Sequence, residues 1–266
     1  TAGASPNSVV AGLAGQLGYQ PVVLAVADQG FANQVSHSLM IEAMALPGEG
    51  VSPEKIEQAA SGFGMAEPPL AMLDALSLTV MDDALHAELH TLEHSHGDKD
   101  STHKHDHGHS HDHSHDHAHN HDHGHGHHHG ATSQRFPESA VYVLEKMAHG
   151  FDRMGADSGY GFYDHEEDGS RELWDGLNVF TRGAKVIPEA DIIDRLIYIQ
   201  ALAAQHCVAQ GLLSSAQADL ASVAGWGFPA STGGICSWQH NVGSDQFARR
   251  AGELATSYGT RFAPAH

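Results

Sequence analysis

The chain has 266 residues, of which 41% are hydrophobic, so it can form one large domain or two ordinary ones with a buried core. Its formal charge of −20 would repel nucleic acids and anionic membranes. No apolar run reaches the roughly 18 residues of a membrane span, and no signal-like segment follows Thr1. Cys207 and Cys236 have no metal-binding spacing. We therefore expect a soluble cytoplasmic protein with two free thiols.

The first expected elements are a helix and a strand. The segment SPNSVVAGLAGQLG offers Ser5 or Asn7 as N-cap and Gly18 as a stop, and QPVVLAVAD indicates a buried strand over residues 22–26. A lone strand cannot satisfy its own backbone donors and acceptors, and the rest of the chain has helical patterns. We therefore expect residues 1–28 to be the end of an α/β domain whose other part precedes this chain.

Three helices are expected before the low-complexity segment. The first spans residues 33–46, and the second has Ser52 as N-cap and Pro53 at its first helical position. The third covers residues 69–94, where leucines and Met81 recur at three- and four-residue steps. Two helices joined as tightly as the first pair should pack against each other.

Helical patterns resume after the low-complexity segment. Residues 139–151 predict a helix that ends in the glycine-containing stretch GADSGYGFYDH. The second half begins after Pro188 with a helix that Gly211 stops. Its apolar stripe consists of Ile192, Leu196, Ile199 and Ala203.

An internal similarity relates the two halves. In each, a helix is followed by Gly50 or Gly211, a short helix that a serine starts, and an aromatic–glycine corner at Phe63–Gly64 or Trp226–Gly227. This approximate repeat predicts two related helical bundles. Glycine is expected at such corners because it adopts backbone angles that other residues avoid.

Short motifs along the chain form an ordered set. They are Pro21–Val26, Gly30–Phe31 with Asn33, Glu42–Ala43, Glu49–Val51, Phe63–Met65, Pro69, Leu73–Asp74, Leu144–Met147 and Ser158–Tyr163. In this order they resemble the C-terminal helical domain of the L-3-hydroxyacyl-CoA dehydrogenases. The segments DRLIYIQALAAQHCVAQGLL, GWGFPASTGGICSW and YGTRFAPA are similar to the terminal repeat of the long multifunctional fatty-acid oxidation proteins.

The resemblance implies a mainly α fold with two tandem helical bundles of the 6-phosphogluconate-dehydrogenase C-terminal-like type. Residues 1–28 would be the last helix and strand of an absent Rossmann domain. Residues 29–165 would form the first bundle, with a disordered histidine-rich loop at 94–130. Residues 166–187 would be a linker, and residues 188–266 the second repeat.

The resemblance also implies a function. Enzymes of this family oxidise 3-hydroxyacyl-CoA to 3-ketoacyl-CoA with NAD in fatty-acid β-oxidation. This chain has no GxGxxG loop, so NAD would be bound by a domain outside it, and the chain alone is expected to be inactive. The expected partners are an acyl-CoA substrate, a second copy in a homodimer, and an upstream NAD domain, with a hydratase domain as a further candidate.

The family's substrate-contacting asparagine corresponds to Asn33, nine residues before Glu42. The motif departs from the family because it is one residue shorter and has Gln34 in place of arginine. Pro68 and Asp157 replace a glycine and a basic residue of the family pattern. A simpler role for Asn33 is to cap its helix.

Histidine occupies nearly every second position of the low-complexity segment. The candidate metal ligands are His103, His105, His107, His109, His111, His113, His115, His117, His119, His121, His123, His125, His127, His128 and His129. Neutral imidazoles in this alternation would bind Ni²⁺ or Zn²⁺ loosely, without the fixed framework of a structural zinc site. The segment is thus a metal buffer or metal-dependent lid, or a tolerated expansion of a loop.

A second hypothesis for the whole chain follows from the same segment. It is a non-catalytic metal-binding or scaffold protein built on a retired dehydrogenase domain, which the altered Gln34, Pro68 and Asp157 would fit. An upstream reading frame with a GxGxxG segment would favour the enzyme instead.

Overall fold

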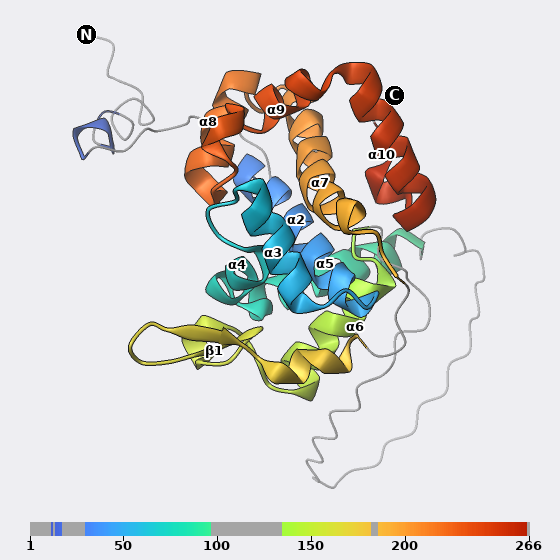
Figure 1. Ribbon diagram of the computed structural model, residues 1–266. Helices are drawn as coiled ribbons and strands as arrows, with labels where there is room; N and C mark the ends of the chain where they lie inside the picture. Colours follow the sequence, from blue (N-terminus) through green and yellow to red (C-terminus); the bar gives the residue numbers. More distant parts are fainter. Residues whose placement is uncertain (1–11, 13, 18–29, 97–134, 182–185, 265–266) are drawn as a thin grey trace, which may run out of the picture.

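The computed structural model describes residues 12, 14–17, 30–96, 135–181 and 186–264, and Figure 1 shows that helices dominate this part. The α-helices are α2 (Phe31–Gly48), α3 (Pro53–Phe63), α4 (Pro69–Leu76), α5 (Leu78–His96), α6 (Glu138–Glu145), α7 (Glu189–Ala209), α8 (Ser215–Trp226), α9 (Ile235–Val242) and α10 (Ser244–Tyr258). The predicted mainly helical fold is confirmed. Among the described residues no helix is long and apolar enough to cross a membrane.

Helix α2 lies at the centre of the molecule, with α7 on one side and α6 on another (Figure 1). Most of its side chains are buried from Leu39 to Pro47, so it contacts neighbours almost all round. The buried core is continuous and takes residues from both halves of the chain. The first half therefore cannot bury its central helix without the second.

Helices α3 and α7 agree with the sequence analysis. Helix α3 has Ser52 as N-cap and Pro53 at its first position, where the missing N–H of proline has no cost. Helix α7 buries Ile192, Leu196 and Ile199 of the predicted stripe. Gly211 follows it with φ 72°, a left-handed conformation that suits glycine.

The single helix predicted over residues 69–94 is wrong. The chain breaks at Ser77, which has φ 75°, and the break separates α4 from α5. The turn is fixed by a distant segment, because the Leu78 N–H donates to the Met154 carbonyl at 2.8 Å and the Ser77 hydroxyl donates to the same oxygen at 3.2 Å. No glycine or proline marks this break in the sequence.

A small antiparallel sheet, missed by the sequence analysis, follows the helix predicted over 139–151. That helix is α6 continued by a π-helical turn, Lys146–Gly150. Strand β1 (Tyr163–His165) then pairs with β2 (Arg171–Leu173). The segment 166–187, predicted to be a linker, thus contains β2, and Leu177 and Phe180 beyond it are buried.

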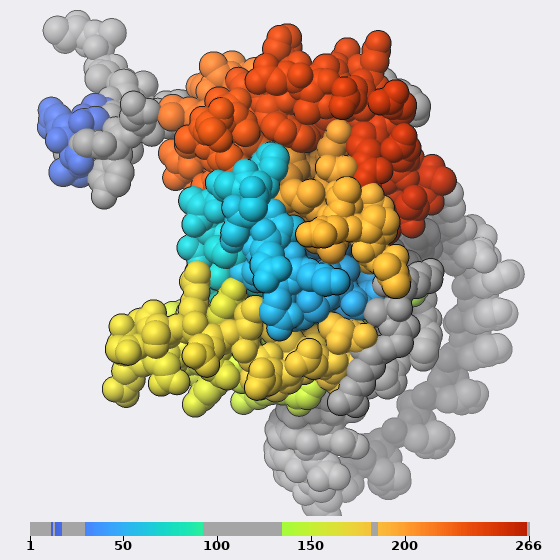
Figure 2. All heavy atoms as spheres, viewed as in Figure 1, coloured from blue at the N-terminus to red at the C-terminus, as the bar shows by residue number. Residues whose placement is uncertain are grey.

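The two aromatic–glycine corners lie against each other. Gly64 and Gly227 end α3 and α8 with φ 98° and 73°. The Ala66 N–H donates to the Gly227 carbonyl at 2.9 Å, and the rings of Phe63 and Phe228 are 5.9 Å apart. A side chain at position 227 would meet the Cβ of Ala66 at 2.7 Å, so the contact requires glycine there. The space-filling view in Figure 2 shows the α8–α10 region joined closely to the α2–α4 region.

Two structural predictions from the sequence concern residues that are wholly or partly outside the described ranges. The strand expected over 22–26 lies outside the described residues. Of the helix expected before it, Gly12 and residues 14–16 are described and are helical. The histidine-rich segment from residue 97 to 134 is likewise outside the described residues.

Candidate functional site

Asn33 lies in the first turn of α2 and is exposed. Gly30 is the N-cap of the helix and makes no side-chain cap bond, so the helix-capping interpretation of Asn33 is wrong. The neighbouring Phe31 is buried against Trp226, with ring centroids 5.6 Å apart. The buried ring fixes the start of α2, on which Asn33 is exposed.

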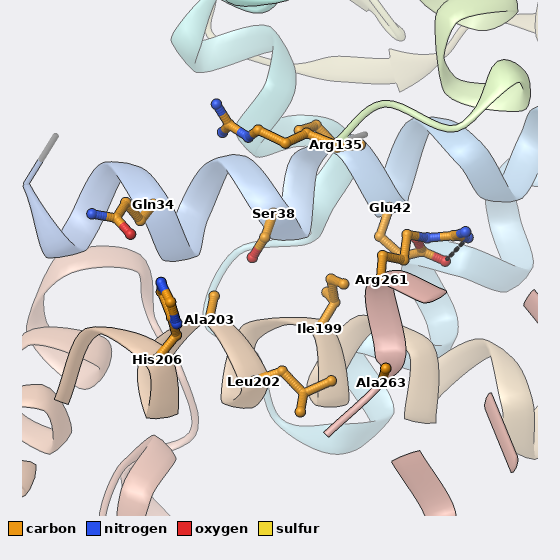
Figure 3. Close-up of a pocket in the computed structure, with 11 residues that line it drawn as sticks. Gln34, Ser38, Glu42, Arg135, Ile199, Leu202, Ala203, His206, Arg261 and Ala263 are labelled. Atoms are coloured by element: carbon orange, nitrogen blue, oxygen red, sulfur yellow. Dashed lines mark hydrogen bonds and ion pairs between the residues drawn. The ribbon is translucent and has the colours of Figure 1, made fainter. Parts of the chain in front are cut away.

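A groove of about 470 Å³ runs along an adjacent face of α2. Figure 3 shows Gln34, Ser38 and Glu42 on α2, spaced four residues apart, with α7 opposite them. The side chains that line the groove are Gln34, Ser38, Ile41, Glu42, Arg135, Ile199, Leu202, Ala203, His206, Arg261 and Ala263. Asn33 is not among them, so the groove and the exposed asparagine are two separate features of α2.

Two lining residues of the groove, Glu42 and Arg261, belong to an ion-pair cluster that also contains Glu49 and Arg195. Arg195 Nε donates to Glu42 Oε1 at 2.5 Å, and its two terminal nitrogens bind the carboxylate of Glu49 at 2.7 and 3.0 Å. Arg261 Nε donates to the second oxygen of Glu42 at 2.7 Å. Two carboxylates thus face two guanidinium groups, and the cluster is neutral.

Burial is complete at the centre of this cluster, where Glu42 and Arg195 are both 0% exposed. Burial lowers the pKa of Arg195, but the attraction of Glu42 and the bonds to Glu49 outweigh it, so the pKa lies above its usual value. The guanidinium also lies over the ring of Tyr258 at 4.3 Å. Arg195 therefore stays ionised, and the ion-pair cluster joins α2 to α7 and to the C-terminal segment.

Two further basic side chains, Arg135 and His206, line the groove outside the ion-pair cluster. Arg135, just before α6, donates its backbone N–H to Glu88 Oε1 at 3.1 Å. Within the described residues its guanidinium makes no recorded ion pair. Burial and the charge of Arg135 together lower the pKa of His37 on α2. His206 forms a 2.8 Å bond through Nε2 with the amide of Gln210.

A second group of buried polar side chains, here called the hairpin clamp, consists of Glu57, Asp74, Tyr163 and His165. Asp74 accepts the N–H groups of Phe162 and Tyr163 at 2.7 and 2.9 Å and lies 2.8 Å from His165 Nε2. These bonds hold the start of β1 against α4. Burial raises the pKa of Asp74, although its hydrogen bonds act in the opposite direction.

Glu57 completes the hairpin clamp from α3. It accepts the Leu70 N–H at 2.9 Å and the Tyr163 hydroxyl at 2.6 Å. Burial raises the pKa of Glu57 to about 7, while these two bonds act to lower it. No guanidinium bonds this carboxylate in the described residues, and the charge of Arg171, which also acts to lower the pKa, does not offset burial.

The predicted metal ligands, from His103 to His129, lie outside the described residues. In the part of the chain that is described, no group of three or more His, Cys, Asp or Glu side chains could hold a metal ion. His149 lies instead 3.3 Å from Asp82 as an ordinary polar pair. The loose metal binding expected of the histidine-rich segment therefore stays a prediction.

Solved structures share this fold. The chain superposes on the crystal structure of 3-hydroxybutyryl-CoA dehydrogenase from Escherichia coli K12 with a TM-score of 0.61 and 17% identity, over 99% of this chain and 63% of that one. It superposes on the dehydrogenase part of multifunctional enzyme 1 from C. elegans with a TM-score of 0.55 and 14% identity, over 97% and 51% of the two chains. The architecture is thus that of the helical region of such dehydrogenases.

A family model matches part of the sequence. Residues 30–111 match the family described as 3-hydroxyacyl-CoA dehydrogenase, C-terminal domain. The resemblance inferred from the motifs is confirmed. The matched range includes both Asn33 and Glu42.

Curated relatives are fatty-acid oxidation proteins. The chain is 33% identical over 79 residues to the glyoxysomal fatty acid beta-oxidation multifunctional protein MFP-a of Cucumis sativus, which covers 29% of this chain and 11% of that protein. It is 29% identical over 118 residues to the fatty acid oxidation complex subunit alpha of Vibrio cholerae, over 42% and 16% of the two. The matches thus span a small part of the length of these relatives.

Proposed function

We propose that this chain is the C-terminal substrate-binding and dimerisation part of a 3-hydroxyacyl-CoA dehydrogenase, which oxidises 3-hydroxyacyl-CoA to 3-ketoacyl-CoA in fatty-acid β-oxidation. The observation that carries the proposal is the family match of residues 30–111. Two tandem helical bundles, the second beginning near Pro188, are part of the proposal. The similar corners at Gly64 and Gly227 support this duplication.

The carboxylates at the fifth position of α3 and of α8 add to the support for duplication. Glu57 accepts an N–H from Leu70, in the first turn of α4. Asp219 accepts the N–H of Cys236, in the first turn of α9, at 2.7 Å. Each half therefore uses an acid on its short helix to hold the start of the next helix, as two copies of one ancestral unit would.

NAD does not fit the residues of this chain, because the sequence has no glycine-rich phosphate-binding loop. We therefore assign cofactor binding to a domain outside the given sequence and derive no step through NAD. The role proposed for the present residues is to bind and orient the substrate. Asn33, exposed on the first turn of α2, would donate its amide to the bound 3-hydroxyacyl group.

The test is to express the natural reading frame that contains this chain and to assay NAD-linked oxidation of 3-hydroxybutyryl-CoA. We expect activity, and we expect Asn33→Ala to lower kcat/KM by about tenfold or more because a hydrogen bond to the substrate is lost. The matched control is Asn241→Ala, at an exposed position of α9, which should leave the rate unchanged.

The same assay tests the role of residues 94–130. Activity that survives their deletion, together with loss of Ni²⁺ or Zn²⁺ binding in calorimetry, would make the histidines an appendage of an enzyme. No activity in the intact frame would contradict the dehydrogenase proposal and would favour the metal-binding or scaffold hypothesis.

A further inference from the structure

The groove beside α2 is lined by apolar side chains and by Arg135, which makes no ion pair with the described residues. Ile41 on α2 and Ile199 on α7 are buried, while Leu202 and Ala203 are half-buried and face the groove. These four side chains form an apolar lining, of which Leu202 and Ala203 expose the larger fraction. Burial of such surface by an apolar ligand is favourable in proportion to its area.

The two arginines that line the groove differ in their partners among the described residues. Arg261 gives its guanidinium to Glu42 and to the carbonyl of Tyr258. Arg135, by contrast, makes no recorded ion pair among the described residues. Arg135 lines the groove, and Figure 3 shows its side chain extending along α2 from a level between Ser38 and Glu42 toward Gln34, on the side of α2 away from α7 in this view. An anion at this place would meet a guanidinium, which is the side chain best suited to a carboxylate.

These features limit the ligand. Among the described residues that line the groove, the only acid is Glu42, which is fully buried and paired with Arg195 and Arg261, so this carboxylate is not available to a cationic ligand. A polyanion such as a nucleotide would meet one uncompensated guanidinium in a protein of formal charge −20. The volume of 470 Å³ lies within the range of about 300–1,000 Å³ that is usual for small-molecule pockets.

We propose that this groove binds a medium-chain carboxylate, with its carboxylate at Arg135 and its hydrocarbon chain along Ile199 and Leu202. Ser38 and Gln34 provide polar surface beside the head group. The inference goes beyond the proposed dehydrogenase function, because Asn33 does not line the groove and no reaction of the ligand is required.

Calorimetric titration of the 266-residue chain with sodium decanoate and with decanol tests the proposal. We expect decanoate to bind at one saturable site and decanol to bind about tenfold more weakly, since it lacks the charge that Arg135 recognises. Equal affinity of the acid and the alcohol would overturn the assignment of the head group. Absence of saturable decanoate binding would overturn the proposal.

Two variants locate the ligand, each with a matched control. Arg135→Gln should weaken decanoate binding about tenfold and leave decanol unchanged, while Arg249→Gln, at an exposed position of α10, should change neither. Leu202→Glu should abolish decanoate binding, while Leu220→Glu, at an exposed position of α8, should not. Binding that is unaffected by both groove variants would overturn the proposal.

A further variant keeps the test informative if Leu202→Glu does not fold. If circular dichroism shows that Leu202→Glu is unfolded, Ala203→Met takes its place, because it fills the groove with apolar atoms and adds no buried charge. It should weaken decanoate binding several-fold, and unchanged affinity would contradict the position given to the chain. The result is independent of the dehydrogenase assay, since decanoate binding can be present or absent whatever the activity of the natural frame.

Discussion

The ion-pair cluster and the hairpin clamp bury the same kind of side chain in opposite ways. In the ion-pair cluster, Glu42 is 0% exposed and is bonded by two guanidinium groups. In the hairpin clamp, Glu57 is held by a backbone N–H and a tyrosine hydroxyl, and burial raises its pKa to about 7. The comparison teaches that buried acids of one helical core can have charged or neutral partners, and that the neutral partners of Glu57 do not offset the effect of burial on its pKa.

The largest effect is expected where a charge loses its partner. Arg195→Ala leaves Glu42 fully buried with Arg261 as its remaining cation, so the free energy of unfolding should fall by about 3–5 kcal/mol. Urea unfolding measures the loss. Arg249→Ala, on the exposed side of α10, is the control and should change stability by less than about 0.5 kcal/mol. A loss below about 1 kcal/mol for Arg195→Ala would contradict the view that the cluster depends on this cation.

The pH dependence of the hairpin clamp should be nearly as large. Because the pKa of Glu57 is raised from 4.5 to about 7 in the folded protein, its stabilising contribution is full below pH 4.5 and is lost as the pH rises through 7. Glu57→Gln imitates the neutral acid, so its stability relative to the parent protein should increase over this window, by at most about 3 kcal/mol. Urea unfolding at several pH values measures the difference.

Glu54→Gln is the control for this pH effect, since Glu54 is exposed on the same helix. Its difference from the parent protein should be the same at every pH from 4.5 to 8. If the curve of Glu57→Gln ran parallel to the parent curve as well, Glu57 would not titrate in this window, and the contrast between the two clusters would be wrong.

A smaller effect is expected from crowding at Asp74. A Cβ atom at Gly161 would lie 2.1 Å from Asp74 Oδ1, so Gly161→Ala must displace the carboxylate that holds the start of β1. We expect a loss of about 1–3 kcal/mol, which thermal unfolding measures. Gly252→Ala in α10, where a Cβ meets nothing within 4 Å, should be neutral or stabilising. Equal effects of the two alanines would argue against a tight clamp.

The smallest effect is expected from one hydrogen bond. Tyr163→Phe removes the hydroxyl that donates to Glu57 and should cost about 1 kcal/mol at neutral pH. Without this donor the pKa of Glu57 should rise further, because the bond now acts to lower it. Carboxyl carbon chemical shifts followed by NMR against pH would show the rise, and a fall in the pKa would contradict the role given to Tyr163.

Much of the fold could be predicted because it depends on local signals. Pro53 after Ser52 marked the start of α3, and the apolar stripe of α7 marked its buried face. The break at Ser77 could not be predicted, since it depends on a bond to Met154, 77 residues away. The hairpin was missed for a similar reason: its strands have three residues each and are held by Asp74 of another helix.

The site residues also differ in whether the sequence alone could identify them. Asn33 was identified by motif resemblance, and its exposed position agrees with a binding role that remains to be tested. No sequence pattern indicated Arg135 as a binding residue, because its position in the groove depends on how α2 and α7 pack in three dimensions. Arg195 did carry a signal that was overlooked. It is a lone guanidinium in the apolar run of α7, which calls for a buried acid such as Glu42.

The ion-pair cluster also bears on how the protein is made. Glu42 bonds with Arg195 and Arg261, which follow it by 153 and 219 residues. At a synthesis rate of about 5–20 residues per second, a ribosome needs roughly 10–45 s to add the second of these arginines after Glu42. Until then the carboxylate of α2 lacks at least one of its two cations, so the ion-pair cluster can be completed only after Arg261 has been translated.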